Sequence, residues 1–208
     1  MADASVDVTG EVRRLRLEIA DDIAALSPGQ WDLPSWCTGW RVRDVLGHLV
    51  HMAESTQVSL SWQIMRNGVR PDVALERIAR KLGDQPVPEL AARLRSAADR
   101  HSRVPGAPSA LGLGDLLVHS ADALRPTGTI PDPPVADVLV VLDAYGKWGR
   151  RVVHAAPDRG VSLAATDAEW HRGSGPEVRG KAVDLLLFVA NRQQVVERLE
   201  GPGVARLN

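Results

Sequence analysis

The sequence has little sulfur, almost no net charge and no long apolar run, and each shortage excludes a class of protein. Its 208 residues contain one cysteine, Cys37, so no internal disulfide can form and a reducing compartment is expected. The formal net charge of -1 gives no electrostatic basis for binding nucleic acid or an anionic membrane. No stretch approaches the roughly 18–20 apolar residues of a membrane-spanning helix, and the first residues lack the apolar core of a signal peptide. We therefore expect a soluble, cytoplasmic protein.

What is present is the composition of an ordinary globular protein, with 44% hydrophobic and 25% charged residues. Apolar residues recur every three or four positions, which predicts helices over residues 8–26, 41–67, 71–82, from about 88, 111–124 and 134–155. After Pro157 the pattern changes to a weak strand at 161–165, a turn at 173–176, one or two helices within 181–199 and a final strand at 204–207. The predicted fold class is mainly α, with a helical bundle over residues 1–156 and a small α/β extension over residues 157–208.

The stretch from Gly39 to Glu54 places polar residues beside the apolar face of a predicted helix. At 100° per residue, Asp44, His48 and His51 fall on a strip that borders the apolar arc. Asp44 is placed either to orient the ring of His48 or to act as a charge in the first helical turn. His51, one turn after His48, is a candidate for proton transfer, for a further metal ligand or for a solvent-exposed position.

A second stretch, residues 115–122, has the same layout. Asp115 and His119 are four positions apart, so their side chains leave a helix on the same face. Asp122 lies on the same strip, and Arg125 follows it three positions later. Asp122 and Arg125 can pair with each other on the surface, or line the mouth of a pocket in which Arg125 receives a carboxylate.

His48, Asp115 and His119 together offer two imidazoles and a carboxylate, which can form a metal site between facing helices. This ligand set suits zinc, and also nickel, cobalt, manganese or iron. Three protein ligands leave one coordination position open, which is the pattern of catalytic rather than structural sites. The alternative is that both histidines are hydrogen-bonded residues at the edge of the core, with Asp115 as a charge near the start of its helix.

The loop from Trp31 to Trp40 contains three of the six tryptophans. Indole rings gathered between two helices either close one end of a core or form the wall of a pocket. Cys37 lies in this loop and has no histidine near it in the sequence, which favours an inert thiol over a nucleophile.

Three segments carry a resemblance to a known family. The first two are W-x-V-R-D-V-L-G-H-L at residues 40–49 and L-G-D-L-L-V-H-S-A-D-A-L-R-P at residues 113–126. They resemble the two signature segments of the DinB-like superfamily and, more narrowly, of the metal-binding domain of the mycothiol-dependent maleylpyruvate isomerase family. Residues 164–180, A-A-T-D-A-E-W-H-R-G-S-G-P-E-V-R-G, resemble the region that follows this domain in many such proteins.

The resemblance implies a DinB-like four-helix bundle that binds a divalent metal, commonly zinc. His48 matches the first ligand, Asp115 the acidic ligand and His119 the last. Asp115 stands where the isomerase has a glutamate, so the shorter side chain must bring its backbone closer or bind through water. Enzymes of the family use a low-molecular-weight thiol, mycothiol or bacillithiol, and a bound cation lowers the pKa of such a thiol.

These observations lead to a first functional hypothesis, a mycothiol-using transferase or isomerase acting on an electrophilic small molecule. His51 or a water moves protons in this hypothesis, and Asp122 and Arg125 are the candidate residues for binding the thiol cosubstrate. The second hypothesis is a metal-binding stress-response or small-molecule-binding protein without thiol transfer. The third is a bundle without metal. A monomer and a homodimer are both compatible with the sequence.

Overall fold

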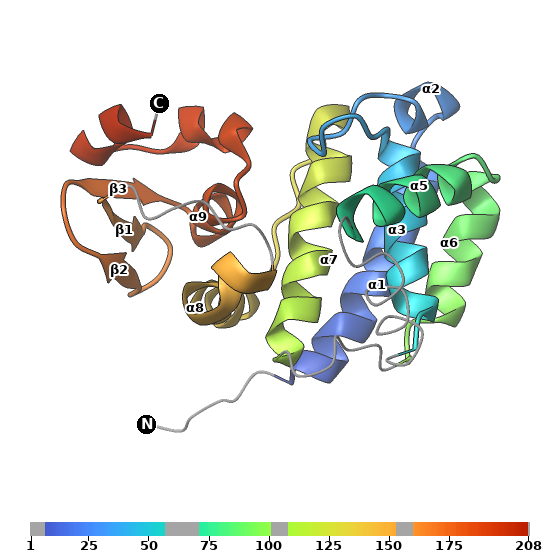
Figure 1. Cartoon of the computed structure of the whole chain (residues 1–208), viewed down its shortest axis with the longest axis horizontal. Helices are drawn as coiled ribbons and strands as arrows, with labels where there is room; N and C mark the ends of the chain where they lie inside the picture. The colour runs from blue at the N-terminus through green and yellow to red at the C-terminus, as the bar shows by residue number, and fades with distance from the viewer. Residues whose placement is uncertain (1–6, 57–70, 101–107, 153–159, 208) are drawn as a thin grey trace. The chain divides into compact units, whose positions relative to one another are not determined.

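The computed structural model describes residues 7–56, 71–100, 108–152 and 160–207 (Figure 1). Contacts between Cα atoms divide these residues into two compact units, one of residues 7–131 and the other of residues from 132 onward. The domain boundary predicted between residues 156 and 157 lies outside the described residues and stays a prediction.

The first unit is a bundle built from four helices: α1 (Val8–Ala25), α3 (Val42–Glu54), α6 (Val87–Ser96) and α7 (Ser109–Leu124). Helix α1 packs against α6 and α7, and α3 packs against α6 and α7 as well, so the four enclose one core (Figure 1). Helix α5 (Pro71–Gly83) covers α3, and the short α2 (Pro28–Trp31) follows α1. A 3-10 turn, η1 (Arg125–Thr127), ends the last helix.

The apolar repeat explains why these segments are helices. In α1, Leu15, Ile19 and Ile23 recur at four-residue spacing and are buried, and the Asp7 side chain accepts from the backbone N–H of Thr9 at the helix start. Helix α7 is buried along most of its length. The described part of the bundle thus matches the predicted four-helix fold.

Helix α3 is fixed at its start and along one side. The carboxylate of Asp44 accepts the backbone N–H of Arg41 at 2.8 Å and also binds its guanidinium. Arg41 has no side-chain acceptor with which to cap the helix, and Asp44 in the first turn stabilises the helix start instead. Asp44 therefore serves this helix start. At Gly47 a Cβ would lie 2.5 Å from the carbonyl oxygen of Ala79, so only glycine allows α5 to approach this closely.

The second unit contains α8 (Val135–Val152) and α9 (Ala182–Val189), which pack together, and a three-stranded sheet. The strand order is β2-β1-β3, where β1 is Ser162–Ala165, β2 is His171–Gly173 and β3 is Glu177–Gly180. Strand β1 pairs antiparallel with β2 and parallel with β3, and its Leu163 lies opposite Arg172 and Val178. Two 3-10 segments, η2 (Gln193–Arg198) and η3 (Pro202–Arg206), complete the unit.

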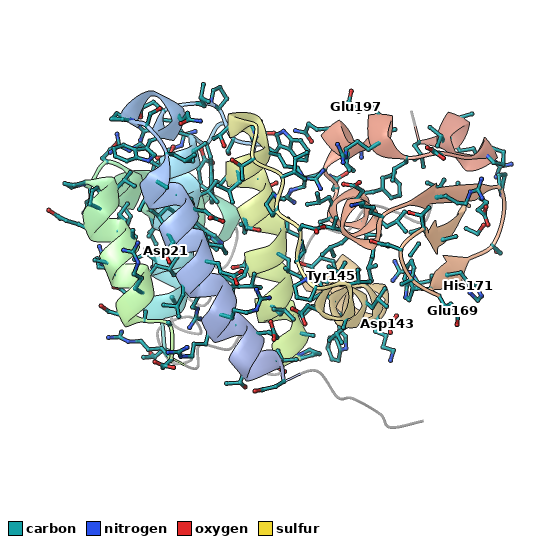
Figure 2. The ribbon with its side chains drawn as sticks, turned by 180° about the vertical axis from the view of Figure 1, so that it is seen from behind. Asp21, Asp143, Tyr145, Glu169, His171 and Glu197 are labelled. Atoms are coloured by element: carbon teal, nitrogen blue, oxygen red, sulfur yellow. The ribbon has the colours of Figure 1, made fainter. Side chains whose placement is uncertain are left out.

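The turn before β2 is tied to α8. Trp170 Nε1 donates to Asp143 Oδ1 at 3.0 Å, and the guanidinium of Arg172 donates to the carbonyl oxygen of Leu142 at 2.7 Å. Figure 2 labels Asp143 on α8 and His171 on β2, on the same side of this unit. The small α/β extension predicted from the sequence is therefore present, with a sheet of three short strands.

Two predicted elements were wrong. The helix predicted over residues 41–67 ends at Glu54, because Ser55 adopts an extended backbone; Ser and Thr hydroxyls at 55 and 56 compete for backbone hydrogen bonds and weaken a helix. Residues 57–70 lie outside the described part of the chain. The final strand predicted at 204–207 is the 3-10 helix η3, since Pro202 has a fixed φ that suits a first helical turn and has no N–H for a strand ladder. Within the described residues, no helix is both long and apolar enough to pass through a membrane.

Candidate metal centre

The loop between α2 and α3 is folded back on itself and attached to α7. The backbone N–H of Val42 donates to the carbonyl oxygen of Leu33 at 3.0 Å, and that of Ser35 donates to Trp40 at 2.8 Å. The left-handed backbone at the loop's tip is provided by glycine, Gly39, with φ of 80°. The N–H of Trp36 donates to the carbonyl oxygen of Asp122 at 3.0 Å. This last bond holds the loop beside the C-terminal half of α7.

His48, Asp115 and His119 come together, from α3 and α7, as the sequence predicts. Asp115 Oδ1 lies 3.4 Å from Nε2 of His48 and 3.6 Å from Nε2 of His119, and the two imidazole centroids are 4.6 Å apart. One nitrogen or oxygen from each residue lies within 4.8 Å of the others. His48 is buried, whereas Asp115 and His119 are half-buried.

The spacing of these atoms fits a metal site better than a hydrogen-bonded cluster. Ligand atoms around a tetrahedral zinc, at bonds of about 2.0–2.1 Å, lie about 3.3–3.4 Å from one another. The two Asp115 distances are close to this value and exceed the roughly 2.7–3.2 Å of ordinary N–H···O bonds. In the described structure, the buried Nδ1 of His48 also has no hydrogen-bond partner, and its Nε2 reaches Asp115 Oδ1 only at the long distance of 3.4 Å.

The other nitrogen of His119 belongs to a second cluster. His119 Nδ1 lies 2.9 Å from Asp122 Oδ2, and the thiol of Cys37 donates to the same oxygen at 3.0 Å. Sγ of Cys37 is 3.5 Å from His119 Nδ1. Burial lowers the pKa of His119, but the hydrogen bonds to Asp122 and Cys37 and the charge of Asp115 raise it more, so that this pKa lies well above its ordinary value.

Two tryptophans of the loop lie against the site residues. The ring of Trp40 stacks on His119 at 6.3 Å with an interplanar angle of 13°, and it lies 5.4 Å from the ring of His48. The guanidinium of Arg125 lies over the ring of Trp36 at 5.4 Å, within cation–π range. Trp40 of this loop thus lies against both histidines, and the two roles predicted for the tryptophans stay predictions.

The remaining predicted site residues are His51, Asp122 and Arg125. His51 is half-buried one turn further along α3, where its charge contributes to lowering the pKa of Glu54; the hydrogen bond from Arg93 is the larger cause. Asp122 is fully buried, with its carboxylate directed at His119 and Cys37. The roles predicted for His51 in proton transfer, and for Asp122 and Arg125 in binding a thiol, stay predictions.

Sequence reasoning missed the position of Cys37 and the contact of Trp40. Cys37 and His119 are separated by 82 residues, and they meet because the loop binds the backbone of α7. No local pattern contains this information. The concentration of tryptophans in the loop was the only signal, and it indicated a pocket wall without indicating which residues face it.

Residues 12–110 match the family model of the mycothiol maleylpyruvate isomerase N-terminal domain. The helical domain is similar to this family over these residues. The resemblance to the isomerase family is thereby confirmed, and it is consistent with the DinB-like superfamily. Residues 40–49 lie within the match, whereas residues 113–126 lie beyond its end. The matched segment includes His48 and ends in the first residues of α7, before Asp115 and His119.

Two solved structures share the fold. A histidine-to-alanine mutant of the mycothiol-dependent maleylpyruvate isomerase is 13% identical, with a TM-score of 0.60, over 94% of this chain and 92% of that chain. A second crystal structure of the mycothiol-dependent maleylpyruvate isomerase is 15% identical, with a TM-score of 0.55 and the same coverage. At these identities the likeness shows the fold alone. Among curated proteins, none matches the sequence.

Proposed function

We propose that this protein is a divalent-metal-dependent enzyme that uses mycothiol as a cosubstrate and acts as a transferase or isomerase. Nε2 of His48, the carboxylate of Asp115 and Nε2 of His119 would hold the metal. The observation that carries this proposal is that one Asp115 oxygen faces both imidazole nitrogens at 3.4 and 3.6 Å, the separation expected of zinc ligands. Similarity to the domain family adds the thiol.

Two imidazoles and one carboxylate favour zinc, and nickel, cobalt, manganese and iron are compatible with the same donors. When bound, a divalent cation lowers the pKa of a thiol and so supplies thiolate at neutral pH. The protein then needs no nucleophilic cysteine of its own. Three protein donors leave room at the metal for the thiol sulfur.

The residues around the site would orient the reactants. Trp40 covers the two imidazoles and restricts access of water on that side. Arg125, held over Trp36, would receive an anionic group of the thiol or of the electrophile. His51 or a water would move the proton that the thiol or its adduct exchanges. The reaction is either transfer of the thiol to an electrophile or isomerisation through a reversible thiol adduct.

A second candidate is a metal-binding stress-response or small-molecule-binding protein without thiol transfer. Two observations favour it: the family match ends before Asp115 and His119, and the two solved isomerase structures are only 13% and 15% identical. We further propose a cytoplasmic location, a monomer or homodimer, and an extension over residues 157–208 that follows a domain of residues 1–156. No nucleic acid or membrane partner is expected.

The metal site is tested by metal content. Wild type and His48→Ala would be purified without a histidine tag or chelator, and both would be analysed by mass spectrometry of the metal. We expect near-stoichiometric divalent metal in the wild type and almost none in the variant, because a buried imidazole donor is lost. Equal metal content in the two proteins would exclude this site.

The thiol reaction is tested separately. Mycothiol should raise the melting temperature of the metal-loaded wild type and be consumed in the presence of a panel of electrophiles, since a ligand that binds only the folded state stabilises it. A protein that binds metal but gives neither response would support the second candidate.

A further inference from the structure

The two nitrogens of the His119 ring face different acidic residues. Nε2 lies 3.6 Å from Asp115 Oδ1, on the side of His48, and Nδ1 lies 2.9 Å from Asp122 Oδ2 on the opposite side. The first distance is too long for an ordinary hydrogen bond, and the second is typical of a strong one between nitrogen and a carboxylate. The ring is therefore held by Asp122 and presented toward the other two donors.

We infer that Asp122 is a positioning residue that keeps the Nδ1 proton on His119 and leaves the Nε2 lone pair free for the metal. This inference rests on the metal site proposed above. A neutral imidazole donates from one nitrogen and accepts or ligates with the other, so a carboxylate at Nδ1 selects the tautomer that ligates through Nε2. A carboxylate behind a ligating histidine also makes the ring a more basic ligand.

The surroundings of Asp122 hold this carboxylate in place. Its side chain is 0% exposed, so Asp122 is not expected to contact a bound molecule directly and would act on it through His119. The thiol of Cys37 donates to the same Oδ2, and the carbonyl oxygen of Asp122 accepts the N–H of Trp36. The loop that carries Cys37 is thereby fixed to the residue that orients His119, and Trp40 from the same loop stacks on the ring.

His48 provides a contrast within the same site. Its Nδ1 is buried and has no hydrogen-bond partner in the described structure, and its Nε2 reaches Asp115 Oδ1 at the long distance of 3.4 Å. A carboxylate thus binds Nδ1 of His119, whereas no polar group in the described structure binds Nδ1 of His48. Loss of Asp122 should accordingly weaken the contribution of one imidazole and leave the other unchanged.

The experiment measures zinc affinity by chelator competition in the full-length wild type, Asp122→Ala, Asp122→Asn and Asp44→Asn. We expect Asp122→Ala to weaken zinc binding by about 10–100-fold, as is typical when the partner of a ligating histidine is lost. Asp122→Asn keeps the shape of the side chain but removes its charge, and it should give a smaller loss of zinc affinity than Asp122→Ala. Asp44→Asn is the matched control, because Asp44 is equally buried in the same domain but binds Arg41, and its zinc affinity should stay within about threefold of wild type.

A second readout does not depend on metal. In metal-free protein, at a pH where the ring is neutral, the 15N shifts of His119 should report a proton on Nδ1 in the wild type and a mixture of tautomers in Asp122→Ala. Unchanged tautomer and unchanged zinc affinity in both Asp122 variants would overturn the inference, as would an equal loss of affinity in Asp44→Asn. If wild type binds no zinc, the proposed metal site fails, and the nitrogen shifts alone decide whether Asp122 sets the tautomer.

Discussion

The two units of the chain use buried polar side chains in different ways. In the second unit, two of the buried or half-buried side chains complete local structural bonds: Asp184 pairs with Arg198 at 3.2 Å, and Arg172 donates to the carbonyl oxygen of Leu142 at 2.7 Å. In the helical bundle, potential metal ligands from a loop and two helices converge, and the contacts of Asp115 with His48 and His119 are longer than ordinary N–H···O bonds. Both groups of residues in the described structure that could hold a metal lie in the bundle. The convergence of several potential ligands, with such long contacts among them, distinguishes the candidate site from structural pairing.

The largest effect is expected from removing the acidic donor. Asp115→Asn keeps the size of the side chain but replaces a charged donor by a neutral amide, so we expect metal affinity to fall at least about 100-fold, more than from loss of a residue behind the ligands. Asp184→Asn, in the second unit, is the control, because it removes a buried carboxylate that pairs with Arg198 and belongs to neither group of potential metal ligands in the described structure. Chelator competition on the folded proteins would measure both. An equal loss of metal affinity in Asp184→Asn and Asp115→Asn would contradict the proposed difference between the two units.

A smaller effect on stability, and none on metal, is expected from Arg172→Ala. This change leaves the Leu142 carbonyl without its 2.7 Å donor and removes the packing of the guanidinium on Trp170, so unfolding free energy should fall by about 1–3 kcal/mol. Arg179→Ala is matched to it on β3, the other outer strand of the sheet, where an exposed pair with Glu177 contributes about 0–1 kcal/mol. Denaturant titration and metal analysis would follow both variants. A loss of bound metal in Arg172→Ala would contradict the distinction between structural polar residues in the second unit and metal ligands in the bundle.

The smallest effect concerns a surface pair on the bundle. The hydrogen bond from Arg93 lowers the pKa of Glu54, against the opposing effect of burial, so ionised Glu54 stabilises the folded state above its unfolded pKa of about 4.3. This stability is lost as pH falls through the lower, folded pKa. We expect Glu54→Gln to lose at most about 1 kcal/mol at neutral pH, and the difference from wild type to vanish in acid. A difference that persists at low pH would show that the effect is not electrostatic.

The sequence predicted the parts of this account that depend on local periodicity. The apolar repeats located α1, α5, α7 and α8, and the four-residue spacing placed Asp115 and His119 on one face of α7. Joining His48 to this pair rested on the matching polar strip of its own predicted helix and on the family resemblance, because helix packing is not encoded in either segment alone. The structure then brought the three together at ligand spacing.

The features that could not be predicted depend on backbone contacts between distant segments. Cys37 reaches His119 because the N–H of Trp36 binds the carbonyl oxygen of Asp122, and any residue can make such a bond. The end of α3 at Glu54 and the 3-10 helix at residues 202–206 were missed for a related reason: apolar spacing locates a buried face but does not determine where a helix ends or whether a short segment forms a strand.

The most direct test of the central claim is a crystal structure of the zinc-loaded protein with anomalous data at the zinc edge. The account predicts one anomalous peak about 2.0–2.2 Å from Nε2 of His48, an oxygen of Asp115 and Nε2 of His119, with Asp122 still bonded to Nδ1. A peak between Cys37, His119 Nδ1 and Asp122, the other group of donors in the bundle, would contradict it, as would no peak at either position.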